Sequence, residues 1–157
     1  MVSKAPNGFT LIELLVAIAI VLVMTGGVIV NYNTYNDDQR TRQAALTVKN
    51  NLRLAQSRAY NGEKPTSSCT QLQGYRVSFA SGSYAIQAQC TEGLAGSPQS
   101  YTLDRGITFS PVPTDILFRV LTSGADGDVT VIVIGLNKSV QFTVAKSGDM
   151  SELTVGQ

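Results

Sequence analysis

Few side chains of this 157-residue sequence could carry out covalent or metal chemistry. The chain has no histidine, which excludes the Ser-His-Asp and Cys-His nucleophiles and every zinc or iron site with a histidine ligand. Its two cysteines, Cys69 and Cys90, are too few for a four-thiolate metal site. We therefore predict a protein that is not an enzyme and has no cofactor, no metal site and no small-molecule substrate.

Two carboxylates share one predicted turn. Asp126 and Asp128 flank Gly127 in the string Ser-Gly-Ala-Asp-Gly-Asp. Calcium takes six to eight oxygen ligands, so two acids of one turn would need further ligands from other segments. We predict a plain hairpin turn and keep Asp126 and Asp128 as the calcium candidates of the alternative hypothesis.

A third acid, Glu13, is the one charged residue in an apolar segment that runs from Phe9 to Val30. The uncharged part of this segment approaches the ~20 residues with which a helix crosses a bilayer. Lys4 precedes the segment and no base follows it until Arg40, so the positive-inside rule places the N-terminus in the cytoplasm. We predict a single-pass helix in the inner membrane. A cleaved secretory signal is the alternative, although no small-residue cleavage site follows the segment.

A carboxylate in an apolar segment needs a cationic partner. An acidic side chain in hydrocarbon costs about 2.5–3.5 kcal/mol on insertion scales, and no Lys, Arg or His lies within the segment to pair with Glu13. Cleavage just before Phe9 would create an α-amino group, which is an ammonium at neutral pH. We expect this ammonium to be the partner; a carboxylate that reaches back to the membrane edge is the alternative.

Gly8 and the residues that follow it, Phe-Thr-Leu-Ile-Glu-Leu-Leu-Val-Ala-Ile-Ala-Ile, resemble the class III leader and N-methylation motif of type IV pilins and type II secretion pseudopilins. The resemblance implies that a prepilin peptidase cuts between Gly8 and Phe9 and methylates the new amine of Phe9. It also implies that Glu13 meets the N-terminal ammonium of an adjacent pilin-like subunit, in a filament built at an inner-membrane assembly platform.

The sequence after Val30 predicts that the helix continues. Apolar residues recur every three or four positions and line one helix face. They are Ala44, Val48, Leu52, Ala55 and Ala59. No proline interrupts residues 9–60, which allows a single helix with Gly26-Gly27 as its weakest point.

Most basic residues in the outer half of this helix lie outside the apolar stripe. They are Arg40, Arg42, Lys49, Arg53 and Arg58. We predict a solvated helix face for them, with a polyanion-binding strip as the alternative. Asn61-Gly62 should end the helix, and Pro65 reinforces that stop.

The remainder of the chain reads as short strands. Alternating apolar residues on both sides of Ser81-Gly82 predict a β-hairpin. Further strands are predicted at Ser100–Leu103, Ile107–Phe109, Ile116–Leu121, Val129–Ile134 and Val140–Val144. Because Val129–Ile134 is apolar at nearly every position, we expect it to be a central strand covered on both faces.

Cys69 and Cys90 flank the predicted hairpin. If the head is exported, the oxidising compartment favours a disulfide between them. Two buried free thiols are the alternative hypothesis. Neither sulfur is expected to act as a nucleophile, because no histidine can activate it.

These elements predict an α+β, pilin-like fold, with a long N-terminal helix, partly transmembrane, packed on an antiparallel β-sheet head. We divide the chain into a leader (1–8), the transmembrane and assembly half of the helix (9–30), the outer half of the helix (31–61) and a β-rich head (62–157). The helix end and the closing strands resemble GspH/FimT-like minor pilins and pseudopilins, although Gln56 stands where those proteins usually have Arg.

Some FimT-like minor pilins bind DNA through a basic Gly-Arg-x-Arg motif near the C-terminus. The comparable stretch here is Ser147–Met150, with Asp149 where an Arg is needed. Phosphate contacts depend on clustered cations, so this departure argues against DNA as a partner.

The sequence therefore predicts a structural subunit of a type IV pilus or type II secretion pseudopilus. It would start in the inner membrane and move to a periplasmic or extracellular filament. The alternatives are a membrane-anchored extracytoplasmic binding module that never polymerises, and a DNA-uptake minor pilin.

Overall fold

The computed structural model describes residues 8–66 and 69–156 of the chain. The predicted leader therefore lies outside the described residues, except for Gly8. The chain divides into two compact units, Met1–Asn36 and Asp37–Gln157.

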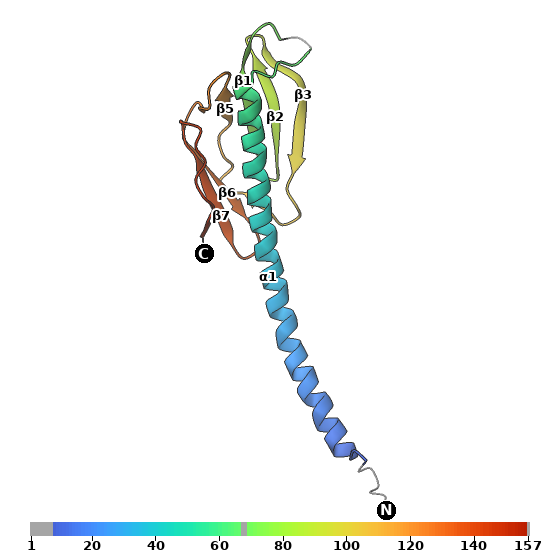
Figure 1. Ribbon diagram of the computed structural model, residues 1–157. Helices are drawn as coiled ribbons and strands as arrows, with labels where there is room; N and C mark the ends of the chain where they lie inside the picture. The colour runs from blue at the N-terminus through green and yellow to red at the C-terminus, as the bar shows by residue number, and fades with distance from the viewer. Residues whose placement is uncertain (1–7, 67–68, 157) are drawn as a thin grey trace, which may run out of the picture. The chain divides into compact units, whose positions relative to one another are not determined.

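Helix α1 spans Leu11–Tyr60 without a break at Gly26-Gly27, which confirms the prediction of one helix (Figure 1). It begins two residues later than the earliest expected start at Phe9. Its end is a Schellman motif, in which Gly62 has φ +65° and its N–H donates to Ala59 O at 3.1 Å. The N–H of Glu63 donates to Arg58 O at 3.0 Å. The predicted stop at Asn61-Gly62 is thus confirmed, because glycine adopts this left-handed backbone at little cost.

The first sheet of the Asp37–Gln157 unit has four antiparallel strands in the order β3-β2-β1-β5. They are β1 (Leu72–Ala80), β2 (Ser83–Cys90), β3 (Gly93–Thr102) and β5 (Ile116–Arg119). Strands β1 and β2 form the predicted hairpin, with Val77 opposite Ile86 and Phe79 opposite Tyr84.

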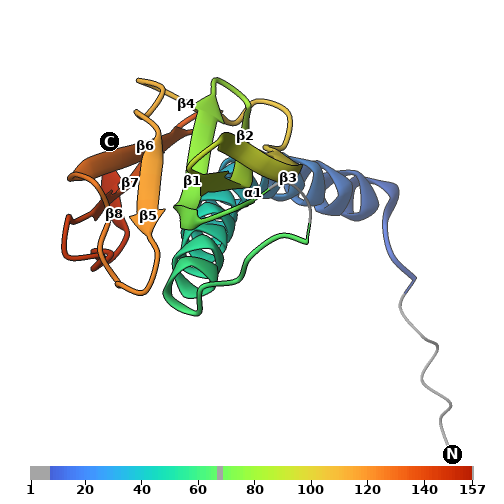
Figure 2. The same cartoon turned by 90° about the horizontal axis from the view of Figure 1, so that it is seen from above.

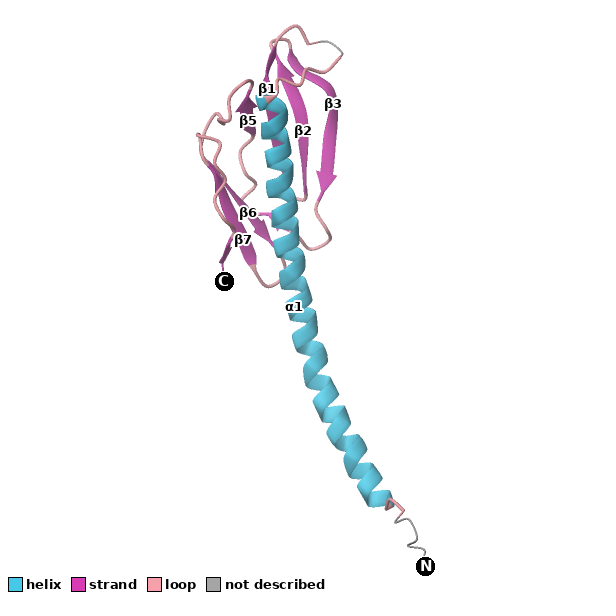
Figure 3. Cartoon of the chain, viewed as in Figure 1, coloured by secondary structure: helices cyan, strands magenta, loops and turns pink. Residues whose placement is uncertain are grey.

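The second sheet has the order β4-β6-β7-β8. Its strands are β4 (Thr108–Phe109), β6 (Val129–Ile134), β7 (Ser139–Val144) and β8 (Thr154–Gly156). The prediction of a single sheet was therefore wrong, because the strands form two antiparallel sheets (Figure 3). Strand β8 was not predicted, and the strand expected at Ser100–Leu103 is the end of the longer β3.

Strand β6 is central in its sheet, as predicted, but it is fully covered on one face only. Val129, Val131 and Val133 are buried, whereas Thr130 is exposed and Ile132 is half-buried. One solvated face is typical of antiparallel sheets. The apolar residues on its second face are therefore not a second core layer.

The core of this unit forms where the α1 segment meets the two sheets (Figure 2). Its helical part is the predicted stripe, with Ala45 fully buried and Ala44 partly buried. Phe109, Phe118 and Phe142 are the largest fully buried side chains from the sheets.

Polar side chains on the two sides of the apolar stripe form hydrogen bonds that attach the helix to the rest of the unit. Lys49 and Gln56 make up one flank, and Asn51 and Arg58 the other. On one flank, Lys49 Nζ donates to Ser151 O at 2.6 Å, and Gln56 Nε2 donates to Ser123 O at 2.6 Å and to Gly148 O at 2.8 Å. Lys49 is only 8% exposed, so the expectation of a solvated base was wrong for this residue.

On the other flank, the contacts go to the first sheet. Asn51 Nδ2 donates to Tyr84 OH at 2.6 Å, and Arg58 Nη1 donates to Gln99 Oε1 at 2.8 Å. The residues of each flank are seven positions apart, which places them on one line along a helix. The stripe and its flanks thus attach α1 to both sheets.

We predict that Leu52→Ala lowers the free energy of unfolding of the full chain by about 2–5 kcal/mol, because it leaves a cavity at a fully buried site. Urea unfolding of the detergent-solubilised chain, followed by tyrosine fluorescence, measures the change. Leu54→Ala is the matched control on the same helix, since Leu54 is 38% exposed. Equal losses for the two variants would contradict the assignment of the stripe as core.

Candidate functional site

The predicted processing site lies just before the start of α1. Gly8, Phe9 and Thr10 are not helical, and Phe9 is 85% exposed. A Cβ built on Gly8 would meet no described atom within 4 Å. Gly8 and Phe9 are thus exposed, and the peptide bond between them lies in non-helical backbone.

Thr10 and Glu13 form a capping box at the first turn of α1. Thr10 N and Thr10 Oγ1 donate to Glu13 Oε2 at 3.4 and 3.3 Å, and Glu13 N donates to Thr10 Oγ1 at 3.4 Å. This reciprocal arrangement satisfies backbone N–H groups that the helix itself leaves without acceptors. This role of Thr10 and Glu13 was not predicted, although Thr-x-x-Glu before an apolar run is the known signature of a capping box.

Phe9 and the first turns of α1 expose an apolar surface. Among the described residues, the large apolar side chains there are all more than half exposed. They are Phe9, Leu11, Ile12, Leu14, Leu15, Val16, Ile18, Ile20, Val21, Leu22, Val23 and Met24. No cation of the described chain forms an ion pair with Glu13 in their midst. Over the residues that the structure describes, no helix meets the length and hydropathy of a membrane span.

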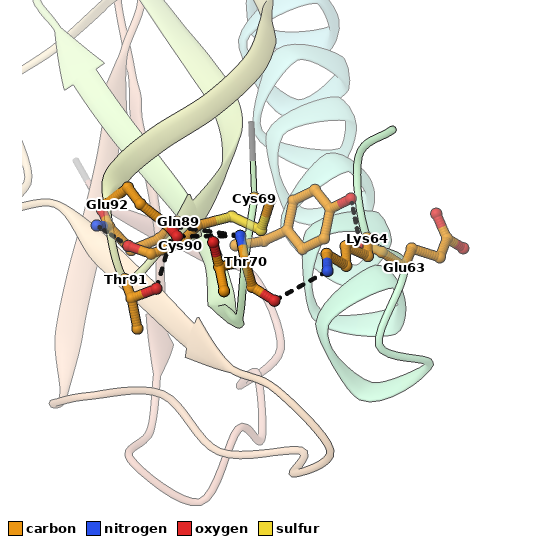
Figure 4. Close-up of a disulfide and its surroundings, with 9 residues drawn as sticks. Glu63, Lys64, Cys69, Thr70, Gln89, Cys90, Thr91 and Glu92 are labelled. Atoms are coloured by element: carbon orange, nitrogen blue, oxygen red, sulfur yellow. Dashed lines mark hydrogen bonds between the residues drawn. A yellow bond between two sulfur atoms is a disulfide. The ribbon is translucent and has the colours of Figure 1, made fainter. Parts of the chain in front are cut away.

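Cys69 and Cys90 form a disulfide, with their Cα atoms 5.6 Å apart (Figure 4). Cys90 is the last residue of β2 and is buried, whereas Cys69 precedes β1 and is half-buried. The bridge therefore fastens the segment that enters β1 to the end of its partner strand.

Glu92 reinforces the same end of the hairpin. Its carboxylate accepts hydrogen bonds from Thr70 N at 3.1 and 3.3 Å and from Thr91 Oγ1 at 3.0 Å (Figure 4). Hydrogen bonds from Thr70, and then from the backbone of Glu92 itself, hold the pKa of the Glu92 carboxyl below its ordinary value. The charged form is thus favoured in the folded state.

The two calcium candidates bind backbone groups of different segments. Asp126 Oδ1 accepts a hydrogen bond from Leu117 N at 3.1 Å, while Asp128 Oδ1 accepts one from Lys146 N at 2.6 Å. Within residues 8–66 and 69–156, no group of three or more acidic, cysteine or histidine side chains has the arrangement of a metal site. Both carboxylates brace the connection between β5 and β6 against neighbouring backbone.

The Ser147–Met150 stretch makes a tight turn after β7. Gly148 is buried with φ +92°, and a Cβ there would collide with Ser123 O. Asp149 Oδ2 accepts a hydrogen bond from Ser147 Oγ at 2.9 Å. This glycine is thus required for packing against Ser123, whose carbonyl is also an acceptor of Gln56.

Gln56 and Lys49 were not identified as structural anchors from the sequence. Gln56 was noted only as a departure from an expected Arg, and Lys49 as one of several helical bases. Their spacing of seven positions beside the apolar stripe is a signal that could have marked them.

Residues 3–29 match the prokaryotic N-terminal methylation motif. This match indicates a precursor processed in the manner of type IV pilins, and such proteins assemble with other pilin-like subunits. It covers the segment in which Gly8, Phe9, Thr10 and Glu13 lie. No curated protein and no solved structure matches the chain.

We predict that the paired change Cys69→Ser and Cys90→Ser lowers the free energy of unfolding by about 3 kcal/mol, as the chain-entropy model gives for a loop of about 20 residues. Unfolding of the unreduced full chain measures this. If reduction destabilises the paired variant as much as the unchanged protein, the disulfide is not the source of the difference.

We predict a pH dependence for Glu92. Because its folded-state pKa is lowered, its stabilisation is present above the unfolded-state value and is lost as the pH falls through the folded-state value. Glu92→Gln should therefore melt below the unchanged protein at pH 7, and this difference should shrink with acidification below about pH 4.5. A difference that stays constant down to pH 3 would contradict this role.

Proposed function

We propose that the protein is a structural, non-enzymatic subunit of a type IV pilus or type II secretion pseudopilus. Prepilin peptidase removes residues 1–8 and methylates the amine of Phe9, and the mature chain joins a filament through the first half of α1. The observation that carries this proposal is the methylation motif at residues 3–29, in which Gly8 and Phe9 are exposed and precede the helix.

The apolar surface from Leu11 to Met24 gives this half of the helix its role. Side chains of this kind are stable in a bilayer or against other apolar helices, but not in water. Residues 9–30 therefore hold the newly made subunit in the inner membrane with the N-terminus in the cytoplasm. Neighbouring helices replace the lipid when the subunit enters the filament.

In this proposal Glu13 sets the axial register between neighbouring subunits of the filament. Its capping contacts with Thr10 are 3.3–3.4 Å long, at the weak end of hydrogen-bond geometry. A charge-assisted contact to the Phe9 ammonium of a neighbouring subunit is stronger. A carboxylate buried without that partner is costly, so subunits that are out of register are disfavoured.

Residues 62–157 form the exported head in this proposal, together with the outer helix at residues 31–61. The Cys69–Cys90 disulfide suits an oxidising compartment. Within the pilin-like class we propose a minor subunit of the GspH/FimT-like kind, which the helix-end and closing-strand patterns support.

The mature N-terminus tests the processing step. Co-expression with a prepilin peptidase should give a chain that begins with an N-methylated phenylalanine at position 9, as read by intact mass and N-terminal sequencing. Gly8→Val is the matched control, because a β-branched side chain at the cleavage site should block cutting. A chain that keeps Met1 in its native host would favour the anchored binding module instead.

Glu13 variants test the assembly step. We predict that Glu13→Ala still inserts into membranes but fails to enter sheared filaments, because the Phe9 ammonium of the neighbouring subunit loses its partner. Glu13→Gln removes the charge but keeps the capping box, because glutamine can take the place of glutamate there. This variant should also insert into membranes and fail to enter sheared filaments. Normal incorporation of Glu13→Gln would mean that helix capping, and not the ion pair, is what Glu13 supplies.

A further inference from the structure

A groove lies between helix α1 and the end of strand β3 in the Asp37–Gln157 unit (Figure 1). Its volume is about 240 Å³, larger than the ~150 Å³ apolar cavity that admits benzene. The groove therefore has room for one six-membered ring together with its substituents.

The floor of this groove is apolar. The lining side chains that are buried or half-buried are Ala44 on the helix and Tyr84, Tyr101 and Leu103 on the sheet side. The rings of Tyr84 and Tyr101 are nearly parallel, with their centroids 5.1 Å apart. Asn51 holds the Tyr84 hydroxyl, and the ring of Phe109 lies edge-on to the Tyr84 ring at 6.1 Å. A floor that is fixed in advance loses little conformational freedom when a ligand packs on it.

The rim of the groove is polar on both sides. The exposed lining side chains all carry hydrogen-bonding groups, and they are Arg40, Gln43 and Thr47 on the helix, and Thr102 and Asp104 on the opposite wall. The helical three are three and four positions apart and the other two are two positions apart, so each set follows one side of the floor. Within residues 8–66 and 69–156, neither Arg40 nor Asp104 forms an ion pair.

An aliphatic side chain is a poor occupant for a groove of this kind. It would pack on the floor, but it would also displace water from the rim, and a polar group that loses water without gaining a partner is penalised. The occupant must therefore offer apolar surface to the floor and hydrogen-bonding groups to both walls.

Charged occupants are disfavoured as well. The carboxylate of Asp104 repels an anion, whereas Arg40 at the rim and the exposed Arg105 beside Asp104 repel a cation. Because charges of both signs lie at the same opening, the groove attracts neither kind of ion strongly. The occupant that these side chains fit is a neutral molecule.

A neutral hexopyranose combines these properties. The C–H groups on one face of the sugar form an apolar patch, which packs on the electronegative face of an aromatic ring. The hydroxyl groups point outward around the ring, and each of them donates and accepts hydrogen bonds. On the protein side Asp104 accepts, Arg40 donates and Gln43 does both, so both walls can bind hydroxyl groups of one sugar ring.

We propose that this groove binds a neutral hexose residue at the end of a glycan, without reacting with it. The inference goes beyond the proposed structural role and does not rest on it. It gives the head a ligand of its own, with Tyr101 as the stacking residue and Arg40, Gln43 and Asp104 as the residues that bind hydroxyl groups.

Saturation-transfer NMR on the purified full chain tests this inference. The chain is kept in dodecylphosphocholine, because a detergent with a sugar headgroup would compete. The probes are the methyl glycosides of glucose, galactose, mannose and N-acetylglucosamine. At least one of them should receive magnetisation at its ring C–H protons and bind with a Kd on the order of 1 mM, as the binding energy per atom of small ligands gives for this size.

Tyrosine variants show whether the sugar binds on the proposed floor. Tyr101→Ala removes the stacking ring and should raise the Kd about two- to tenfold, whereas Tyr101→Phe keeps the ring and should leave the Kd nearly unchanged. Tyr60→Ala is the matched control, since Tyr60 is 59% exposed and does not line the groove.

A glutamine variant tests the rim without disturbing the core. Gln43→Ala should raise the Kd about two- to tenfold, because it removes a hydrogen-bonding partner of the hydroxyl groups. Gln39→Ala is the matched control, since Gln39 is an exposed glutamine of the same helix that does not line the groove.

No transfer to any of the four glycosides would overturn the inference, and so would equal effects of Tyr101→Ala and Tyr60→Ala or of Gln43→Ala and Gln39→Ala. Tighter binding of glucuronate or glucosamine than of methyl glucoside would contradict a neutral ligand. Binding of the free hexoses but not of their methyl glycosides would overturn the glycan as the source of the sugar. All of these results leave the proposed function standing, because the N-terminal mass and the Glu13 variants test that separately.

Discussion

The attachment of one helix to two sheets is the constraint on which the Asp37–Gln157 unit depends. The apolar stripe of α1 consists of alanines, one valine and one leucine, and all of them except the partly buried Ala44 are fully buried. Small side chains allow the helix backbone to approach both sheets closely. The polar flanks then fix its rotation, because Asn51 and Arg58 reach the first sheet while Lys49 and Gln56 reach the loops beside the second. A rotation of the helix about its axis would break both sets of contacts.

Local sequence patterns were sufficient for the elements but not for their arrangement into sheets. The helix, its stop at Asn61-Gly62 and the β1–β2 hairpin follow from period and turn chemistry. The division into two sheets does not, because it depends on which strands pair over long sequence separations. Strand β8 has only three residues, too few for a period to mark it, and it forms because its backbone pairs with the edge of β7.

Some residues of the candidate site could be predicted from the sequence, whereas the contacts of others could not. Glu13 was singled out because a carboxylate is unusual in an apolar segment, and Gly8 and Phe9 because they resemble the prepilin cleavage motif; the roles of all three stay predictions. Lys49 was misread, since a lysine that buries its stem and donates to one carbonyl looks like a solvated base in sequence. Asp126 and Asp128, on either side of Gly127, were predicted to belong to a plain turn, but the backbone N–H groups that they bind, those of Leu117 and Lys146, could not be predicted from the sequence. Backbone acceptors and donors of this kind are invisible until the chain is folded.

The location of the disulfide determines which parts of the unit can separate under mechanical load. Cys69–Cys90 closes a loop within the first sheet, and the backbone connections β3–β4, β4–β5 and β5–β6 are the covalent links between the two sheets. A pull applied along α1 would be transmitted to β1 through the backbone that joins them, whereas the direct contacts of α1 with the second sheet and its loops are noncovalent and would be loaded in shear. The disulfide stabilises the β1–β2 hairpin but not the contacts between the two sheets. Under increasing force, the second sheet would detach from the helix while the bridged hairpin stayed closed.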